Sequence, residues 1–434
     1  MKSSSIQKLW SLCWMVALAV LPAWVGAQPL ITHEDESKVP SYILPDLLTS
    51  ENGKPILSAE AWRSLRRPEL LELFTHQMFG EAPSEAVELS SELLTDQRGL
   101  MDGAAHCKEV VIHLRPREAK TTLPITVLIY QPAGSPKPVP AFLALNFGGN
   151  HTLSDDPQIR LSQTWMRNQP DRGIVDHRAT EASRGTQAGR WPVRKIIDRG
   201  YALVTAYYGD IDPDFDDGWS NGIHPFFFRE GQQAPEVHQW GSIAAWAWGL
   251  SRILDYLHQE PTIDPKRVAV MGHSRLGKTA LWAGASDERF ALVISNNSGC
   301  GGAALSRRAY GETLRRINSS FPHWFNDAFT RFNDREALLP FDQHQLLALI
   351  APRPLYIASA AEDQWADPKG EFLSAWHASS VYRLLGSRGI ESGVMPALDE
   401  PVGHQVRYHI RRGPHDVTDY DWAQYLDFAD AHLK

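Results

Sequence analysis

The stretch Val268-Ala269-Val270-Met271-Gly272-His273-Ser274-Arg275-Leu276-Gly277-Lys278 places one serine between an apolar run and a segment that favours a helix. The apolar run predicts a buried strand, and the following Thr279-Ala280-Leu281-Trp282-Ala283 predicts a helix. Ser274 would then occupy a tight strand-to-helix turn that presents its hydroxyl at the end of a sheet. The match to Gly-x-Ser-x-Gly is imperfect, because Leu276 stands at the last glycine position. A serine that only caps a helix is the alternative interpretation.

Other short apolar runs surround this segment and alternate with helical patterns. The expected strands cover residues 122–131, 139–147, 201–208, 267–271, 290–295 and 354–359, and the expected helices cover 239–258 and 421–433. Strands separated by helices favour an α/β fold, a three-layer sandwich whose mostly parallel sheet has helices on both faces. Residues 151–195 and 303–345 break the rhythm, so we expect insertions over the active-site end of the sheet.

The overall composition is that of a globular chain. Hydrophobic residues make up 43% of the 434 residues and charged residues 22%, a balance that supports a large core. The formal net charge of -8 provides no basic field for a polyphosphate, so we expect no nucleic-acid partner. Residues 28–434 contain no repeat and no low-complexity linker, and we expect a single catalytic domain and a monomer. Whether Cys107 and Cys300 form a disulfide stays open.

The first 27 residues have the pattern of an export signal. Lys2 and Lys8 precede an apolar run over residues 9–25, and Val25-Gly26-Ala27 supplies small residues before a cut at Gln28. The apolar run is short for a retained membrane anchor, which is the alternative. We therefore predict a cleaved signal peptide over residues 1–27, no membrane association afterwards, and a periplasmic or extracellular enzyme.

A serine nucleophile needs a base, and the base needs an acid that orients it. The loop after the strand at 354–359 carries Glu362 and Asp363, and we select Asp363 as the acid with Glu362 as the second choice. Asp367, which precedes Pro368, is expected to be a turn or cap residue.

Three histidines near the C-terminus are candidates for the base. His415 lies in a Gly-Pro loop just before the last helix, which suits a base presented over the sheet. His404 is a rival, and His409, in an apparent strand, is expected to be structural. The spacing of the three matches no familiar zinc pattern, so we expect no metal site.

Several motifs occur in order along the chain: Gly272–Lys278, Ser295–Gly302, Arg307–Glu312, Glu362–Pro368 and Gly413–Asp416. Together they closely resemble bacterial glucuronoyl esterases of carbohydrate esterase family 15, from about residue 60 onward. The resemblance implies an α/β-hydrolase that cleaves the ester between 4-O-methyl-D-glucuronic acid of glucuronoxylan and alcohol groups of lignin. It also implies that neither a metal nor an organic cofactor takes part.

Carried over by position, the resemblance assigns roles to single residues. Ser274 would be the nucleophile, His415 the base and Arg275 an oxyanion-stabilising group. The residues that would contact the uronate sugar are Lys278, Glu312 and Trp365. One position departs from the family: fungal members have Glu before Ser-Gly-x-Gly-Gly, whereas this chain has Asn297, which cannot serve as the acid. Some bacterial relatives place the acid after a later strand, where Asp363 stands.

Two other functions compete with this interpretation. One is a different carbohydrate esterase, such as an acetyl xylan esterase, and the other is a catalytically inactive carbohydrate-binding relative. The acidic run over residues 210–217 invites a calcium site, but Pro213 and the absence of a glycine after Asp216 favour an ordinary acidic loop. The segment Asn146–His151 either shapes the oxyanion region or is a simple turn.

Overall fold

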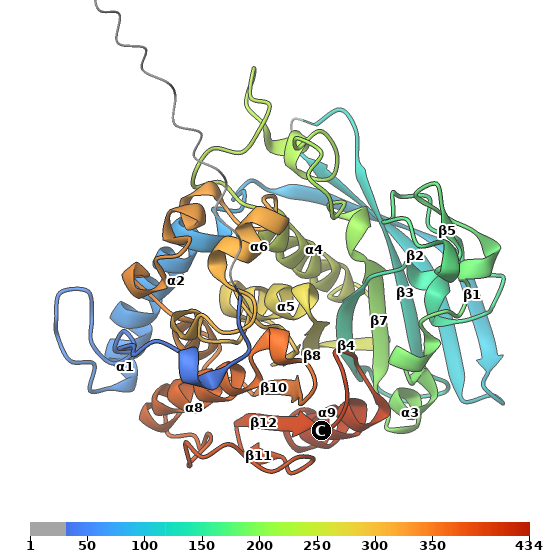
Figure 1. Cartoon of the computed structure of the whole chain (residues 1–434). Helices are drawn as coiled ribbons and strands as arrows, with labels where there is room; N and C mark the ends of the chain where they lie inside the picture. Colours follow the sequence, from blue (N-terminus) through green and yellow to red (C-terminus); the bar gives the residue numbers. More distant parts are fainter. Residues whose placement is uncertain (1–31, 118) are drawn as a thin grey trace, which may run out of the picture. The chain divides into compact units, whose positions relative to one another are not determined.

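A ten-stranded sheet forms the centre of the computed structural model, which describes residues 32–117 and 119–434 (Figure 1). The order across the sheet is β1-β2-β3-β7-β4-β8-β9-β10-β12-β11. The strands are β1 (Val87–Leu100), β2 (Ala105–Pro116), β3 (Leu123–Pro132), β4 (Val139–Asn146), β7 (Ala202–Tyr207), β8 (Ile263–His273), β9 (Leu292–Asn296), β10 (Leu355–Ala360), β11 (Val402–Gly403) and β12 (Val406–Arg411). The short strands β5 (Ile174–Val175) and β6 (Arg178–Ala179) pair separately.

The centre of the sheet is parallel and its two edges are antiparallel. Strands β7, β4, β8, β9, β10 and β12 run parallel to one another. At one edge, β1, β2 and β3 form an antiparallel extension that joins β7, and at the other edge β11 pairs antiparallel with β12. The predicted mostly parallel sheet is therefore confirmed for the part that carries Ser274. Strands β1 and β2 were not predicted. Strand β1 is largely exposed, and β2 is mostly buried but its apolar residues are interrupted by polar and charged ones, so neither has the apolar run of a central strand.

Helices cover both faces of the sheet, as the α/β prediction requires (Figure 1). They are α1 (Ala59–Ala61), α2 (Arg67–Phe74), α3 (Val193–Asp198), α4 (Ser242–Leu257), α5 (Arg275–Ser286), α6 (Leu314–Ser320), α7 (Gln343–Ala348), α8 (Pro368–Leu384) and α9 (Asp419–Leu433). One hydrophobic core receives side chains from α2, α4, α5, α7 and α8, and the other from α3 and α9. Along β4, Leu143 enters the first core and Phe142 the second, since alternate side chains of a strand face opposite ways.

The two predicted insertions start where central strands end. Residues 151–195 follow the end of β4 and contain β5, β6 and several short 3-10 turns, and residues 303–345 follow β9 and contain α6. Both leave the sheet at the C-terminal ends of parallel strands. Open α/β sheets bind their ligands at this end.

The described chain from residue 32 onward forms one compact unit. The predicted signal peptide lies outside the described residues. Within the described part, no helix combines the length and apolar character needed to cross a bilayer. Cys107 and Cys300 are both buried and unpaired, so the disulfide that the sequence left open is not formed. Burial raises the pKa of the Cys107 thiol to about 12, which keeps it protonated.

Candidate active site

Ser274 lies in the tight turn between β8 and α5. Its backbone angles are φ 58° and ψ -128°, in the region that residues other than glycine rarely adopt. Gly272 makes this turn possible, because a Cβ at that position would stand 1.8 Å from the carbonyl oxygen of Leu276. The backbone of Leu276 therefore approaches Gly272 closely. The resulting tight turn presents Ser274 at the C-terminal end of the sheet, as a nucleophile turn requires.

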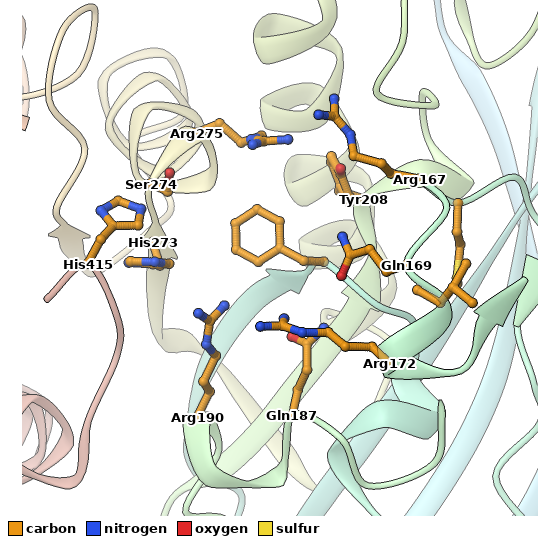
Figure 2. Close-up of a pocket in the computed structure, with 13 residues that line it drawn as sticks. Arg167, Gln169, Arg172, Gln187, Arg190, Tyr208, His273, Ser274, Arg275 and His415 are labelled. Atoms are coloured by element: carbon orange, nitrogen blue, oxygen red, sulfur yellow. The ribbon is translucent and has the colours of Figure 1, made fainter. Parts of the chain in front are cut away.

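His415 lies beside Ser274 and bonds to Asp363. Figure 2 shows the imidazole of His415 and the hydroxyl of Ser274 on the same side of a cavity that both residues line. His415 Nδ1 is 2.5 Å from Asp363 Oδ2. Asp363 follows β10, and His415 comes from the loop between β12 and α9. Three residues that are far apart in the sequence thus converge at one edge of the sheet.

Asp363 receives a second hydrogen bond from Asn297, whose Nδ2 donates to the same Oδ2 at 2.8 Å. Burial by itself raises the pKa of the Asp363 carboxyl, but the hydrogen bonds and charge of His415, with the Asn297 bond, outweigh it and hold this pKa below its ordinary value. Glu362, by contrast, is exposed, and its backbone N–H donates to the carbonyl of Gly413. The structure therefore brings Asp363, and not Glu362, to His415.

Hydrogen bonds from Arg411 hold the loop that carries His415. Only 2% of Arg411 is exposed, and its guanidinium donates to the carbonyl oxygens of Arg412 at 2.9 Å, Pro414 at 3.1 Å and Asp416 at 2.6 Å. Arg411 Nε donates to buried Asp421 at 2.7 Å, so the charge of Arg411 is compensated. The ring of His415 also packs against His273, with 4.4 Å between ring centroids.

The other two C-terminal histidines lie elsewhere. His409 is fully buried, and its ring nitrogens bond to Tyr356 Oη and to Asp421 Oδ1, each at 2.9 Å. This placement is the structural one expected from the sequence. His404 is exposed and lines a separate surface hollow beside β11. In the described residues, no three His, Cys, Asp or Glu side chains gather in a way that suits a metal ion.

Arg275, directly after the nucleophile, is held by a buried carboxylate. Its guanidinium forms an ion pair with Asp214 and lies over the ring of Trp324, 4.9 Å from the centroid. Asp214 also accepts hydrogen bonds from His323 at 3.0 Å, from Trp324 at 2.7 Å and from Tyr208 at 3.0 Å. Burial raises the pKa of Asp214, but these bonds and Arg275 hold it well below its ordinary value.

Nothing in the sequence marks Asp214 for this position, because Arg275, His323 and Trp324 lie more than sixty residues away along the chain. The acidic run does not converge on one point. Asp210 accepts hydrogen bonds from Thr164 at 2.6 Å and from the Thr126 backbone at 3.2 Å, away from the Asp214 partners. This divergence agrees with the interpretation as an acidic loop beside the site.

Lys278, Glu312 and Trp365 form a second group on the α5 side of the site. Lys278 is buried and its Nζ donates to the carbonyl of Ser298 at 2.7 Å. Burial lowers the pKa of Lys278, and the charge of Glu312 acts against this shift. Burial raises the pKa of Glu312, while Lys278 and a hydrogen bond with Trp365 act against that shift. The predicted sugar-contacting residues therefore lie together, and 39% of Trp365 is exposed.

The cavity beside Ser274 has a volume of about 290 Å³ and is formed largely by the insertion over residues 151–195 (Figure 2). This insertion contributes Arg167, Gln169, Arg172, Gln187 and Arg190. The sequence predicted that the segment covers the site but not which of its side chains face inward. Its polar side chains alternate without a regular period, so no sequence signal separates those that line the cavity from those in solvent.

A serine in a strand-to-helix turn of a mostly parallel sheet, with a histidine and a carboxylate beside it, defines the class of α/β-hydrolases. A family model for glucuronyl esterase of fungi matches residues 185–386. A promiscuous CE15 esterase from a marine bacterial metagenome has a solved structure that is 50% identical, covers 93% of this chain and 100% of that chain, and gives a TM-score of 0.86.

The glucuronoyl esterase from Solibacter usitatus is 48% identical, with coverage of 92% and 100% and a TM-score of 0.86. The 4-O-methyl-glucuronoyl methylesterase 1 of Sodiomyces alcalophilus is 41% identical over 200 residues, which are 44% of this chain and 39% of that protein. This chain therefore belongs to the glucuronoyl esterases of carbohydrate esterase family 15, and it is a carboxylic ester hydrolase.

Proposed function

We propose that this enzyme hydrolyses the ester between 4-O-methyl-D-glucuronic acid of glucuronoxylan and alcohol groups of lignin. Ser274 is the nucleophile, His415 the general base and Asp363 the acid of the triad. The observation that carries the proposal is the 2.5 Å hydrogen bond between His415 and Asp363 beside a cavity that Ser274 also lines. The names of similar proteins, glucuronoyl esterase and 4-O-methyl-glucuronoyl methylesterase, support the substrate class.

In the first half of the reaction, Ser274 becomes acylated by the uronate. The Nδ1–H of His415 donates to Asp363, which leaves Nε2 unprotonated and able to take the proton of the Ser274 hydroxyl. Ser274 Oγ attacks the carbonyl carbon and forms a tetrahedral intermediate. His415 then gives its proton to the departing alcohol oxygen, the ester C–O bond breaks, and the glucuronoyl group stays on Ser274.

In the second half, water releases the sugar acid. His415 takes a proton from water, the resulting hydroxide oxygen attacks the acyl carbon, and the proton returns to Ser274 Oγ as its bond to carbon breaks. The product leaves as glucuronic acid and releases its remaining proton to solvent, which gives glucuronate. Asp363 stays ionised throughout and stabilises the imidazolium that forms in each half.

Arg275 stabilises the oxyanion that develops in both halves. Arg275 is the first residue of α5, so its backbone N–H lies directly after the nucleophile. Its side-chain Nε is buried and has no hydrogen-bond partner in the described part of the chain. Asp214 and the Trp324 ring fix the guanidinium, so little reorganisation is needed when the charge appears. A donor of this kind is typically worth about 3–4 kcal/mol in the transition state.

The group of Lys278, Glu312 and Trp365 holds the sugar. A buried ammonium beside a carboxylate can donate to and accept from neighbouring hydroxyls, and a half-exposed indole can lie against a pyranose ring. These contacts orient the uronate so that its ester carbonyl faces Ser274.

Release of acid from benzyl glucuronate tests the proposal. We expect Ser274→Ala and His415→Ala to lower kcat by about 10³-fold or more without loss of the fold, as checked by thermal unfolding. Glu362→Gln is the matched control, because the side chain of this exposed neighbour of Asp363 forms no hydrogen bond or ion pair with His415 in the described structure. Activity of Ser274→Ala equal to that of the unmodified enzyme would refute the role of Ser274.

Two other outcomes would redirect the proposal. Faster hydrolysis of acetyl esters than of alkyl glucuronate esters would indicate an acetyl xylan esterase on the same scaffold. Absence of all ester hydrolysis, together with no labelling of Ser274 by an active-site phosphonate, would indicate a carbohydrate-binding relative without catalysis.

We also propose that the enzyme is exported after removal of residues 1–27 and acts as a monomer in the periplasm or outside the cell. The small residues before Gln28 support the cleavage site. N-terminal sequencing of the mature protein should begin at Gln28, and a mature protein that retains Lys2 would contradict the cleavage.

A further inference from the structure

The cavity beside Ser274 is lined by four arginines and by no carboxylate. Two of these charges are compensated, since Arg275 pairs with Asp214 and Arg190 Nε lies 2.6 Å from Asp416. Arg172 is exposed and has neither an ion pair nor a side-chain hydrogen bond within the described residues. Figure 2 shows its guanidinium directed toward the cavity. The cavity therefore keeps excess positive charge, which favours an anionic ligand.

The remaining arginine of the four, Arg167, adds to the positive charge of the cavity. A guanidinium nitrogen of Arg167 lies 4.0 Å from Asp214, a carboxylate that already forms an ion pair with Arg275. About half of the Arg167 side chain is exposed. Its charge is therefore only partly balanced.

A second, independent feature of the same cavity points to a ligand. Gln187 is 8% exposed, and its Oε1 is buried without any hydrogen-bond partner in the described structure. Buried polar atoms are nearly always paired, so an unpaired acceptor at a cavity wall can take a hydrogen bond from a bound molecule. Gln187 and Arg172 both line this cavity. A hydroxyl group of a bound molecule would satisfy its Oε1.

The cavity also has an apolar part, formed by Phe147, Met166 and Ile174. Its volume of about 290 Å³ is close to the lower limit of ~300 Å³ for ligand pockets. An apolar wall next to cations and an unpaired acceptor suits an aromatic ring that bears both a carboxylate and a hydroxyl.

We infer that this cavity binds the alcohol portion of the ester and takes an aromatic alcohol that carries a carboxylate. The inference rests on the proposed function, which places the sugar against Lys278, Glu312 and Trp365. None of these three residues lines the cavity. The sugar and the alcohol are attached to the same carbonyl carbon at Ser274, so the alcohol extends from the nucleophile into the arginine-lined side.

The test compares two esters of the same shape, 4-carboxybenzyl glucuronate and 4-carbamoylbenzyl glucuronate. We expect kcat/KM at low salt to be about five-fold higher for the carboxylate ester. This is the ratio that the attraction of one partly exposed ion pair would produce. In 1 M NaCl the ratio should approach one, because the Debye length falls to about 3 Å. Arg172→Gln should remove most of the preference at low salt. Arg160→Gln is the matched control, an exposed arginine of the same insertion that does not line the cavity, and it should leave the ratio unchanged.

Equal kcat/KM for the two esters, or a preference that Arg172→Gln does not reduce, would overturn the inference. Inhibition by free glucuronate gives a second check. If Arg172→Gln weakens this inhibition and has no effect on the ester preference, the cavity binds the sugar acid and the inference is wrong. Failure of the proposed function is distinguishable, because the unmodified enzyme would then hydrolyse neither of these esters nor benzyl glucuronate.

Discussion

The shared oxygen of Asp363 allows a sharp prediction for the variant Asp363→Asn. Oδ2 accepts one hydrogen bond from His415 Nδ1 and another from Asn297 Nδ2. In Asp363→Asn, the amide must place its oxygen at this position, because its NH2 group would oppose the Asn297 donor. The amide oxygen then still accepts from His415, and the imidazole keeps the tautomer with Nε2 unprotonated.

The variant should therefore lose the negative charge but not the orientation of His415. Two unit charges about 4 Å apart at an effective dielectric of 20 interact by about 4 kcal/mol, of which the amide dipole retains a part. A loss of about 3 kcal/mol in the transition state lowers kcat by about 10²-fold. This is less than the about 10⁴-fold loss that accompanies an inverted tautomer in serine hydrolases.

The second variant in the design is Asn297→Gly, which removes the orienting donor. Asn297 has a φ of 48°, which glycine adopts without strain. Alone, Asn297→Gly should lower kcat by about 3- to 10-fold through loss of one hydrogen bond to a charged group. Combined with Asp363→Asn it should lower kcat by about 10⁴-fold, because the amide can now turn its NH2 toward His415.

The assay is kcat for benzyl glucuronate at pH 7, with thermal unfolding of all variants and Glu362→Gln as the control. The informative quantity is the coupling between the two sites. If Asp363→Asn already loses about 10⁴-fold and Asn297→Gly adds nothing, Asn297 does not orient residue 363 and the reasoning fails.

Three further predictions concern residues around this triad. Ser274→Gly should raise the free energy of unfolding by about 1 kcal/mol in denaturant titration while it abolishes esterase activity, because it relieves the φ of 58°; lower stability than the unmodified enzyme would contradict the strain. Arg275→Lys should lower kcat by about 10²-fold with a smaller change in KM, because lysine loses the planar fork that bonds Asp214, and unchanged steady-state kcat would refute the oxyanion role. Burial raises the pKa of Glu371 from 4.5 to about 8, so between these pH values the native state holds a proton that the unfolded state releases. The free energy of unfolding should therefore fall by on the order of 4 kcal/mol as the pH rises from 4.5 to 8. Urea denaturation of Glu371→Gln should show a flatter pH dependence, and an unaltered slope would show that Glu371 is not protonated.

Much of the geometry of the candidate site was predictable because its signals are local. Gly272 and the apolar residues before it predict the strand and turn that present Ser274, and the Gly-Pro sequence predicts the loop of His415. Asp363 was predictable from its place directly after a buried strand. In each case a few adjacent residues determine the backbone, and the sheet aligns the strand ends without further information.

The supporting residues were not predictable from such signals. Asp214 and Asn297 bond to partners 61 and 66 residues away, and nothing in their own neighbourhood distinguishes them from ordinary loop residues. Helix α8, which begins at Pro368, was likewise missed, since its polar and apolar residues alternate without a clear stripe; only the cap role of Asp367, which accepts from Gly370, was expected. Long-range pairing of this kind depends on the finished fold.

The hydrogen bonds from Arg411 to the loop of His415 affect how the enzyme unfolds on heating. A surface loop without regular secondary structure ordinarily opens in local fluctuations far smaller than global unfolding. Here, opening would break hydrogen bonds to three carbonyls and expose the buried partnership of Arg411 with Asp421, which also anchors the start of α9. His415 should therefore stay in place until α9 itself detaches. The amide hydrogens of its loop should then exchange with solvent together with those of α9, and more slowly than those of exposed loops.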